Sequence, residues 1–556
     1  MSRKVSGKGE LWKLSFKYIK KVTAALLAAV LLLLCGSGCS EKDGSGYIFK
    51  YDIAANPVTL DPQTANDSSA YEIIANLFEG LLKVDNDGNI QGAAAESYDV
   101  SEDGLVYTFK LREDVYWYDG REFEAPCTAH DFVFAFQRLF KPATKSKTAG
   151  GFFCIKNAQA INSGSIAELS ELGVEAVGDY DLVITLEYPN PSFPVLLTTA
   201  PAMPCNQEFY ESTNGKYGLY ANAVASNGAF YVHSWSYDPW SKDNNNIIMR
   251  ANVKNNENER IYPYGLNFFI EEEDSYQNFL NEQSHVYITS GAEAVRLLDM
   301  GYEYSESSNK VWGVLFNVKS DAFRHEGLRQ ALAYSINRNS TETDATGYEK
   351  SNSLIPSSVK LGDDGYRELV GRDSYLTYSS LLAENALDSA LPTMDKSNMT
   401  GLTLYVPDDD AIMDYVSSVA QQWQTGLNFY CNIKRLSAAD YEKVLKSGEF
   451  DFIVADISGS FNSPYAYLSS FLSTGSGNYS GYVNSSFDVL MERAESAVTA
   501  EESAELFFEA EETVINGAVF IPLLGQSEYA FLGEDCRDII YNPFSRTVVF
   551  REAKKF

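Results

Sequence analysis

Histidine is scarce in this chain of 556 residues, with only four, and cysteine is little more frequent, with seven. The histidines are scattered, and no cysteine spacing indicates a zinc knuckle; Cys127-x-x-His130 is at most half of a metal site. Acidic residues from Asp85 to Glu96 have the spacing of a calcium loop, but Ile90 stands where glycine must turn the chain, which favours a hairpin. The sequence therefore predicts no bound metal and no cofactor.

Catalytic motifs are also missing. The chain has no G-x-S-x-G elbow, no H-E-x-x-H and no G-x-x-x-x-G-K phosphate loop. Paired carboxylates for glycoside hydrolysis are not excluded, but no pair stands out. These absences indicate a protein that binds rather than one that catalyses.

Positive charge is in short supply. The chain has 44 Lys and Arg against 76 Asp and Glu, a net charge of −32. Such an acidic surface argues against nucleic acid as a partner and against electrostatic attachment to anionic lipid. It favours solubility at a cell surface, although it also suits cationic ligands.

A long hydrophobic run is absent too. The apolar stretch of residues 24–34 is short of the ~20 residues that span a membrane, and it follows a basic segment, as in a signal peptide. Gly36-Ser37-Gly38-Cys39 is similar to a bacterial lipobox, although Gly36 stands where leucine is preferred. We therefore expect a signal peptide at 1–38, a lipidated Cys39 and a polar tether at 39–46, which places the protein on the extracellular face of the bacterial cell membrane. An ordinary secreted or buried Cys39 is the alternative.

Five cysteines follow Cys39, so at least one is unpaired. The length of the chain predicts two or three domains with enough core to fold without disulfides. The alternation of residues 106–112 predicts a half-buried strand, and Asp103-Gly104 and Asp119-Gly120 predict turns around it. A helix is expected after Thr128, with Asp131 as its capping-box partner.

The segments "NLFEGLL", "AAESYDVSEDGLVYTFKLREDVYWYDG" and "CTAHDFVFAFQRLFKP" resemble the signature segments of the extracellular solute-binding proteins of family 5, the oligopeptide- and dipeptide-binding proteins of ABC importers. The resemblance implies an α/β, periplasmic-binding-protein-like type II fold, with two lobes, a hinge and an extra small domain. The expected parts are lobe I at 47–90, the small domain at 91–204, lobe I again at 205–310, lobe II at 311–519 and a return to lobe I at 520–556. Within lobe II, residues 415–423 are expected to form an amphipathic helix that ends near Gly426, and residues 487–512 are expected to be helical.

The resemblance also implies a ligand cleft between the lobes, in which an extended peptide pairs with backbone strands. The candidate ligand-binding residues are Asn66, Asp67, Ser68, Asp409, Asp456, Ser458, Gly459, Ser460, Asn462 and Asn478. One departure matters: relatives that bind peptides carry an aspartate at the position of Ser460, where it pairs with the amino terminus of the peptide. A serine offers no such charge, and Asp456 and Asp409 are the candidates to replace it.

The function that this resemblance implies is that of a monomeric lipoprotein that captures short peptides and delivers them to the permease and ATPase subunits of an ABC importer, without a reaction of its own. Three alternatives stay open: the same fold with a non-peptide solute such as an oligosaccharide, a receptor for signalling peptides, and an extracellular hydrolase. A nickel ligand fits least, because histidines are few.

Overall fold

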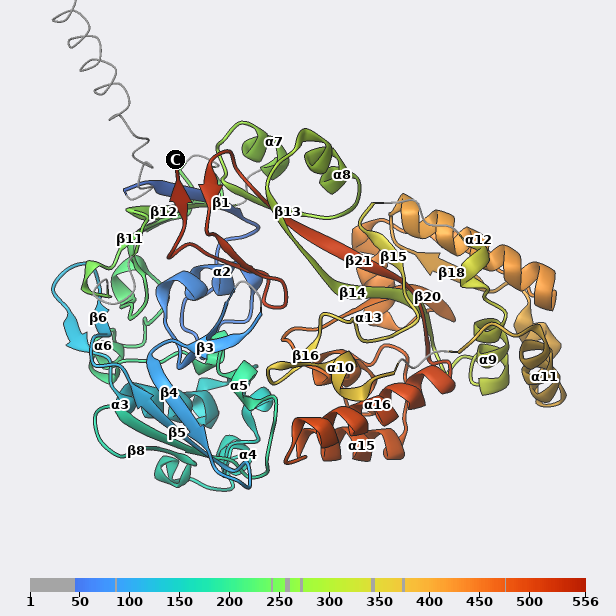
Figure 1. Cartoon of the computed structure of the whole chain (residues 1–556), viewed down its shortest axis with the longest axis horizontal. Helices are drawn as coiled ribbons and strands as arrows, with labels where there is room; N and C mark the ends of the chain where they lie inside the picture. The colour runs from blue at the N-terminus through green and yellow to red at the C-terminus, as the bar shows by residue number, and fades with distance from the viewer. Residues whose placement is uncertain are drawn as a thin grey trace, which may run out of the picture.

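The computed structural model describes residues 46–85, 88–241, 244–255, 261–270, 274–341, 346–372, 376–475 and 477–556. Two bodies are joined by two long antiparallel strands, β14 (Tyr304–Phe316) and β21 (Phe520–Leu532), as Figure 1 shows. The predicted two-lobed α/β architecture is therefore confirmed. Within the described ranges, no helix combines the length and apolar character that a membrane crossing requires. The predicted signal peptide and Cys39 lie outside these ranges.

The first body contains a four-stranded sheet in the order β1 (Ile48–Ile53), β12 (Gly265–Ile270), β11 (Asn246–Ala251) and β10 (Phe230–Ser236). β1 is parallel to β12, and the other pairs are antiparallel. Helix α2 (Ser68–Leu77) begins at Asp67, whose Oδ1 accepts a hydrogen bond of 2.8 Å from the N–H of Ala70. The hairpin of β2 (Leu82–Val84) and β3 (Ile90–Gly92) follows α2 in the chain. The C-terminal hairpin of β23 (Ile540–Asn542) and β24 (Thr547–Val549) packs against α2 through β24.

A second four-stranded sheet lies below the first in Figure 1, in the order β4 (Ala95–Val100), β5 (Val106–Leu111), β9 (Asp181–Thr185) and β8 (Val174–Ala176). Tyr107, Phe109 and Leu111 are buried while the intervening side chains are exposed, so the predicted alternation is confirmed. Helix α3 (Ala129–Phe140) has the predicted capping box of Thr128 and Asp131. This sheet lies inside the expected insertion of residues 91–204, whose limits stay a prediction.

The second body contains a seven-stranded sheet in the order β13 (Val286–Thr289), β21, β14, β20 (Phe452–Ser458), β18 (Thr403–Val406) and β19 (Asn432–Arg435), with β15 (Tyr348–Lys350) also paired to β21. Helices cover both faces: α10 (Tyr366–Val370), α14 (Pro464–Leu468), α15 (Ser485–Glu495) and α16 (Ala500–Asn516) on one, and α9 (Glu326–Tyr334), α11 (Ser380–Ala390) and α12 (Asp410–Leu427) on the other. This double cover explains why residues 452–455 of β20 are all buried.

The predicted helix boundaries were partly wrong in this body. Residues 487–512 form two helices, because α15 ends at Glu495 and Thr499 caps a new helix by accepting a hydrogen bond from the N–H of Glu502 at 3.2 Å. The helix predicted at 415–423 begins earlier, at Asp410, since Asp409 caps it. A helix N-cap depends on one polar side chain. The prediction rested on the spacing of apolar residues, which does not locate such a side chain.

The five described cysteines are free thiols, four of them buried and Cys431 half-buried. The shorter helices of the first body are α4 (Ala158–Asn162), α5 (Phe193–Leu196), α6 (Gln207–Ser212), α7 (Ser275–Leu280) and α8 (Gly291–Met300). The described part of the chain is thus held by its hydrophobic cores: one in the first body, one on each face of the large sheet and a small one between α7, α8 and β21.

Candidate ligand-binding cleft

A cavity of about 280 Å³ lies between the two bodies, which we call the interlobe cavity. The first body contributes the β2–β3 hairpin, Thr198, Thr199 and residues 540–545, and the second body contributes residues 460–462, Ser358, Lys360 and Gly362. Residues 305–308 of β14 line it where the chain crosses from one body to the other. A cavity built from both bodies at their crossing is where hinge closure encloses a ligand.

The lining of the interlobe cavity is dominated by small hydroxyl and amide side chains. They are Thr198, Thr199, Ser305, Ser307, Ser308, Ser358, Ser460, Asn462, Asn542 and Ser545. Aromatic side chains are added by Phe461, Tyr541 and Phe544. Asp85, Glu306 and Lys360 add charged groups to this lining. Hydroxyl and amide groups donate and accept hydrogen bonds, so the lining suits a ligand with many polar groups, such as peptide bonds.

The two bodies touch beside this cavity. Lys360 Nζ donates a hydrogen bond of 2.7 Å to Asn89 Oδ1 across the gap, and the Oγ atoms of Ser192 and Ser463 lie 2.9 Å apart. Both serines are buried. Lys360 is itself positioned by its backbone N–H, which donates to Asn462 Oδ1 at 2.8 Å. These contacts join the β2–β3 hairpin to Lys360 and the start of α5 to the segment that follows β20.

The end of β20 leads into this region through residues 460–462, which line the cavity. β18 pairs with β20 only through Phe452 and Ile453, and in the described part of the chain no strand continues that pairing along residues 454–458. Ser458 and Ser460 are exposed. Gly459 between them has no room for a side chain, because a Cβ would lie 2.6 Å from the ring of Tyr467. An extended ligand can add to such an edge through main-chain hydrogen bonds.

The structure places two of the predicted ligand-binding residues, Ser460 and Asn462, in the interlobe cavity. Ser68 lines a different cavity, of about 340 Å³, with Asn66 exposed in the loop before it. Asp67 is committed to capping α2. Ligand binding by these residues stays a prediction. They do not all line the same cavity.

The other five predicted residues line neither of these two cavities. Asp409 Oδ1 accepts from the N–H of Ile412 at 2.9 Å, and its Oδ2 accepts from the hydroxyl of Tyr348 at 2.7 Å. Asn478 bonds within its own loop, to the carbonyls of Leu472 and Tyr482. Asp456 is half-buried in β20, opposite Trp312 of β14, while Ser458 and Gly459 end that strand.

Sequence reasoning missed the remaining lining residues, notably Thr198, Thr199, residues 305–308 and residues 540–545. They come from three segments that are far apart in the chain, and single serines and threonines in loops and strand ends give no periodic signal. Residues 304–308 of β14 are all exposed or half-buried, whereas the second half of the strand is mostly buried, so only this run of polar residues marked a solvent-facing strand end.

Asp409 belongs to a hydrogen-bonded chain beside the crossing strands. Gln526 Nε2 donates to Tyr348 Oη at 2.7 Å and to Ser290 Oγ at 3.2 Å, and Trp312 Nε1 donates to Gln526 Oε1 at 2.8 Å. This series of hydrogen bonds therefore connects α8 through β21 and β15 to the N-terminus of α12. The carboxylate of Asp409 stabilises this junction, which argues against Asp409 as the replacement for an aspartate at position 460.

The cavity at Ser68 contains a buried carboxyl group. Glu72 Oε1 accepts from the hydroxyl of Tyr51 at 3.2 Å, and Oε2 accepts from the N–H of Val548 at 2.9 Å. Burial raises the pKa of Glu72 to about 8, although both hydrogen bonds and the nearby Arg546 oppose the shift. Glu72 thus holds its proton in the folded protein at neutral pH.

Replacement Glu72→Gln is expected to flatten the pH dependence of stability between about pH 5 and pH 8. The folded pKa of about 8 lies above that of an unfolded glutamate, ~4.3, so the folded state binds more protons in this window. Stability is then fully present below the unfolded pKa and falls as pH rises, by up to ~1.4 kcal/mol per pH unit for one group. Urea unfolding at three pH values measures the slope, and an equal slope in both proteins would contradict the assignment.

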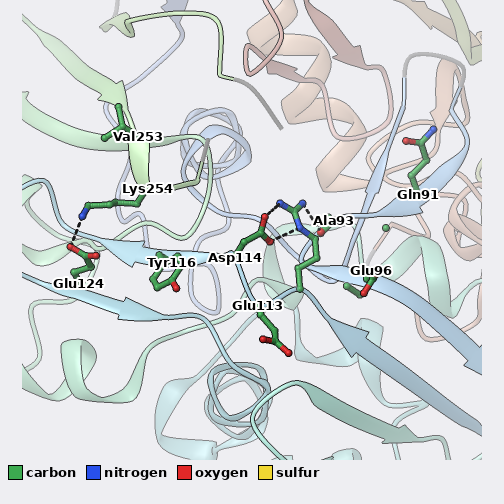
Figure 2. A pocket seen from close by; sticks show the side chains of 12 residues that line it. Gln91, Ala93, Glu96, Glu113, Asp114, Tyr116, Glu124, Val253 and Lys254 are labelled. Carbon is green, nitrogen blue, oxygen red and sulfur yellow. Dashed lines mark hydrogen bonds and ion pairs between the residues drawn. The ribbon is translucent and has the colours of Figure 1, made fainter. Parts of the chain in front are cut away.

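Another cavity, of about 940 Å³, is an open hollow on the first body alone, shown in Figure 2. Its basic groups are paired: Arg112 Nε lies 3.0 Å from Asp114 Oδ1, and Lys254 Nζ lies 2.8 Å from Glu124 Oε2. The second body does not contribute to it. Among the described residues, no three His, Cys, Asp or Glu side chains are arranged to hold a metal ion, here or elsewhere.

Residues 89–479 match the bacterial extracellular solute-binding proteins, family 5. The oligopeptide-binding protein OppA of Bacillus subtilis (strain 168) is 26% identical, with 96% of this chain and 98% of that protein aligned, and a dipeptide-binding protein of Lactococcus lactis subsp. cremoris (strain MG1363) is 24% identical over 93% and 95%. Among solved structures, OppA of Listeria monocytogenes bound to peptide superposes with a TM-score of 0.68 at 22% identity, covering 92% of this chain and 99% of that one, which confirms the periplasmic-binding-protein-like type II fold. The chain belongs to the family 5 bacterial extracellular solute-binding proteins.

Proposed function

We propose that this protein captures short peptides in the interlobe cavity and delivers them to the permease and ATPase subunits of an ABC importer. The observation that carries the proposal is the end of β20. β18 does not pair with its backbone beyond Ile453, and residues 460–462, which follow the strand, line a cavity with polar side chains from both bodies. A peptide there gains main-chain hydrogen bonds from the strand and is enclosed when the bodies close. The peptide-binding relatives support the same ligand class.

The test is thermal stabilisation by a library of two- to six-residue peptides. A peptide present at about one hundred times its Kd stabilises the folded protein by ~2.7 kcal/mol, which raises Tm by a few degrees. Oligosaccharides are the comparison, because hydroxyl, amide and aromatic side chains of the lining also suit a neutral sugar. No shift with any peptide, together with a shift by an oligosaccharide, would refute peptide capture.

The protein acts by binding alone in this proposal. Incubation of purified protein with a bound peptide, followed by mass spectrometry, is expected to return the peptide intact. Appearance of cleaved peptide in proportion to protein would instead support the extracellular hydrolase.

We further propose that the mature protein is anchored to the outer face of the membrane through a lipid on Cys39. The support is the basic segment, the apolar stretch and the small residues before Cys39. Replacement Cys39→Ser is expected to release the protein from the membrane fraction into the medium or to leave it unprocessed. Wild-type protein that lacks the mass of a diacylglyceryl group would contradict the anchor.

A further inference from the structure

One edge of the first body carries aromatic side chains that its core does not bury. The edge is the end of the four-stranded sheet where β1 and β12 begin, and the C-terminus lies beside β1 there in Figure 1. Tyr47 is 41% exposed, Tyr264 is 57% exposed and Phe556 is 38% exposed. These three residues and the half-buried Tyr262 form a surface that we call the aromatic edge.

The main chain holds these residues together. The N–H of Tyr264 donates a hydrogen bond of 2.8 Å to the carbonyl of Tyr47. Phe556 directly follows β25 (Lys554–Lys555). The ammonium group of Lys555 lies 5.4 Å from the centre of the Tyr47 ring, which brings β25 against the start of β1. The aromatic edge is therefore one surface, although its residues come from three separate segments of the chain.

Each ring of the aromatic edge has a basic group at a cation–π distance, ~6 Å or less from its centre. The four pairs are Tyr47 with Lys555 at 5.4 Å, Tyr262 with Lys554 at 4.3 Å, Tyr264 with Arg250 at 5.3 Å and Phe556 with Arg537 at 5.9 Å. Lys554 Nζ also lies 2.7 Å from Asp538 Oδ2, and Lys555 Nζ lies 3.6 Å from Glu282 Oε2. Acidic partners thus offset part of the positive charge, and the rings are the distinctive feature of this surface.

The aromatic edge is close to the proposed lipid anchor along the chain. Tyr47 follows Cys39 by eight residues. Such a segment spans at most ~28 Å when it is fully extended, so an anchor at Cys39 keeps this edge within that distance of the membrane. A short tether also raises the effective concentration of the two surfaces, so that a contact too weak to form in solution becomes populated.

We propose that the aromatic edge docks on the lipid surface of the membrane and orients the first body there. The inference rests on the proposed anchor at Cys39. Tyrosine side chains favour the interface between water and lipid, because the ring is apolar while the hydroxyl stays hydrated. The long basic side chains beside the rings extend their charged ends toward lipid phosphates from the same position. The edge shares no residue with the interlobe cavity, so docking leaves the candidate ligand site uncovered.

The test is photolabelling of the intact lipoprotein on phosphatidylcholine vesicles that carry a diazirine near the lipid headgroup. Mass spectrometry of the digested protein is expected to find lipid adducts at residues 46–49, 262–265 and 554–556. Trp240 is the internal control: it is 95% exposed, but the β10–β11 loop that contains it lies at the opposite end of the sheet, so it should stay unlabelled.

The outcomes separate the docking edge from the anchor. Vesicle-bound protein without adducts at the edge, or with equal labelling of Trp240, would overturn the docking edge and leave the anchor standing. Protein that lacks the diacylglyceryl mass and does not sediment with the vesicles would overturn both. Addition of phosphatidylglycerol should change the labelling little; labelling that requires this anionic lipid and disappears in high salt would overturn the role of the rings.

The double replacement Tyr47→Ser with Tyr264→Ser is expected to remove most of the adducts from the edge while the protein stays anchored. The matched control is Tyr220→Ser with Tyr378→Ser, which removes two tyrosines that are 57% and 48% exposed and should leave the labelling unchanged. Circular dichroism verifies that both variants are folded. Adducts that survive the first double replacement, or that disappear equally in the control, would overturn the docking edge.

Discussion

Replacement Ser460→Asp is expected to raise the affinity for peptides with a free amino terminus by about tenfold to hundredfold at pH 7. Ser460 is exposed and lines the interlobe cavity at the end of β20. A hydrogen bond that involves a charged group contributes ~1.5–3 kcal/mol, which corresponds to that range of affinity. The gain should be absent for the same peptide with an acetylated terminus. Calorimetry with both forms of one tripeptide measures the effect.

The wild-type protein is expected to bind the free and acetylated forms with similar affinity. Among the described acidic residues of the lining, Asp85 accepts hydrogen bonds from Asn89 and Gln91, at 2.8 and 2.7 Å, and Glu306 accepts from the hydroxyl of Tyr529 at 3.0 Å. Ser460→Asn, which is polar but uncharged, is the control and should not raise the affinity. A tenfold preference of the wild type for the free amine would contradict this reading of Ser460.

Replacement Glu511→Ala is expected to destabilise the protein by ~3–5 kcal/mol, because it leaves a buried charge without its partner. The side chain of Glu511 is fully buried on α16, and its Oε1 lies 2.6 Å from Arg367 Nη2. The same carboxylate accepts hydrogen bonds from the N–H groups of Leu354 and Ile355 and from the hydroxyl of Tyr366. Urea unfolding measures the loss.

A second effect is expected at the cleft. The backbone that Glu511 holds at Leu354 and Ile355 leads directly to Ser358 and Lys360, which line the interlobe cavity. Folded Glu511→Ala protein should therefore bind peptide more weakly. The matched control is Glu505→Ala on the same helix, where the ion pair with Arg372 is about half exposed and contributes less than ~1 kcal/mol. Equal destabilisation by the two changes would contradict a structural role for Glu511.

Local structure was predictable where one short segment contains its own cause. The strand at 106–111 and the helix at 129–140 are confirmed, because alternation, turn residues and the Thr128–Asp131 capping box all act within a few residues. The break between α15 and α16 was not predicted, since apolar periodicity continues through a region that a single cap at Thr499 divides. The family's characteristic segments identified the two-lobed fold.

The binding site was predictable only in part. Ser460 and Asn462 were identified through their segment, and both line the interlobe cavity. Asp409 was an expected ligand-binding residue, but its carboxylate caps α12 and accepts the hydroxyl hydrogen of Tyr348. The same acidic sequence can bind a ligand or cap a helix. The two cases differ only in whether the backbone that follows turns into a helix next to the carboxylate.

Composition and local pattern are enough to tell that this chain carries none of the catalytic motifs sought and that it is strongly acidic, and its resemblance to a family adds the two-lobed α/β fold. Folding alone brings Thr198, residues 305–308 and residues 540–545 around Ser460. The physical reason is distance along the chain: periodicity and capping act over a few residues, whereas the walls of a cavity are set by long-range packing between segments that carry no mark of one another.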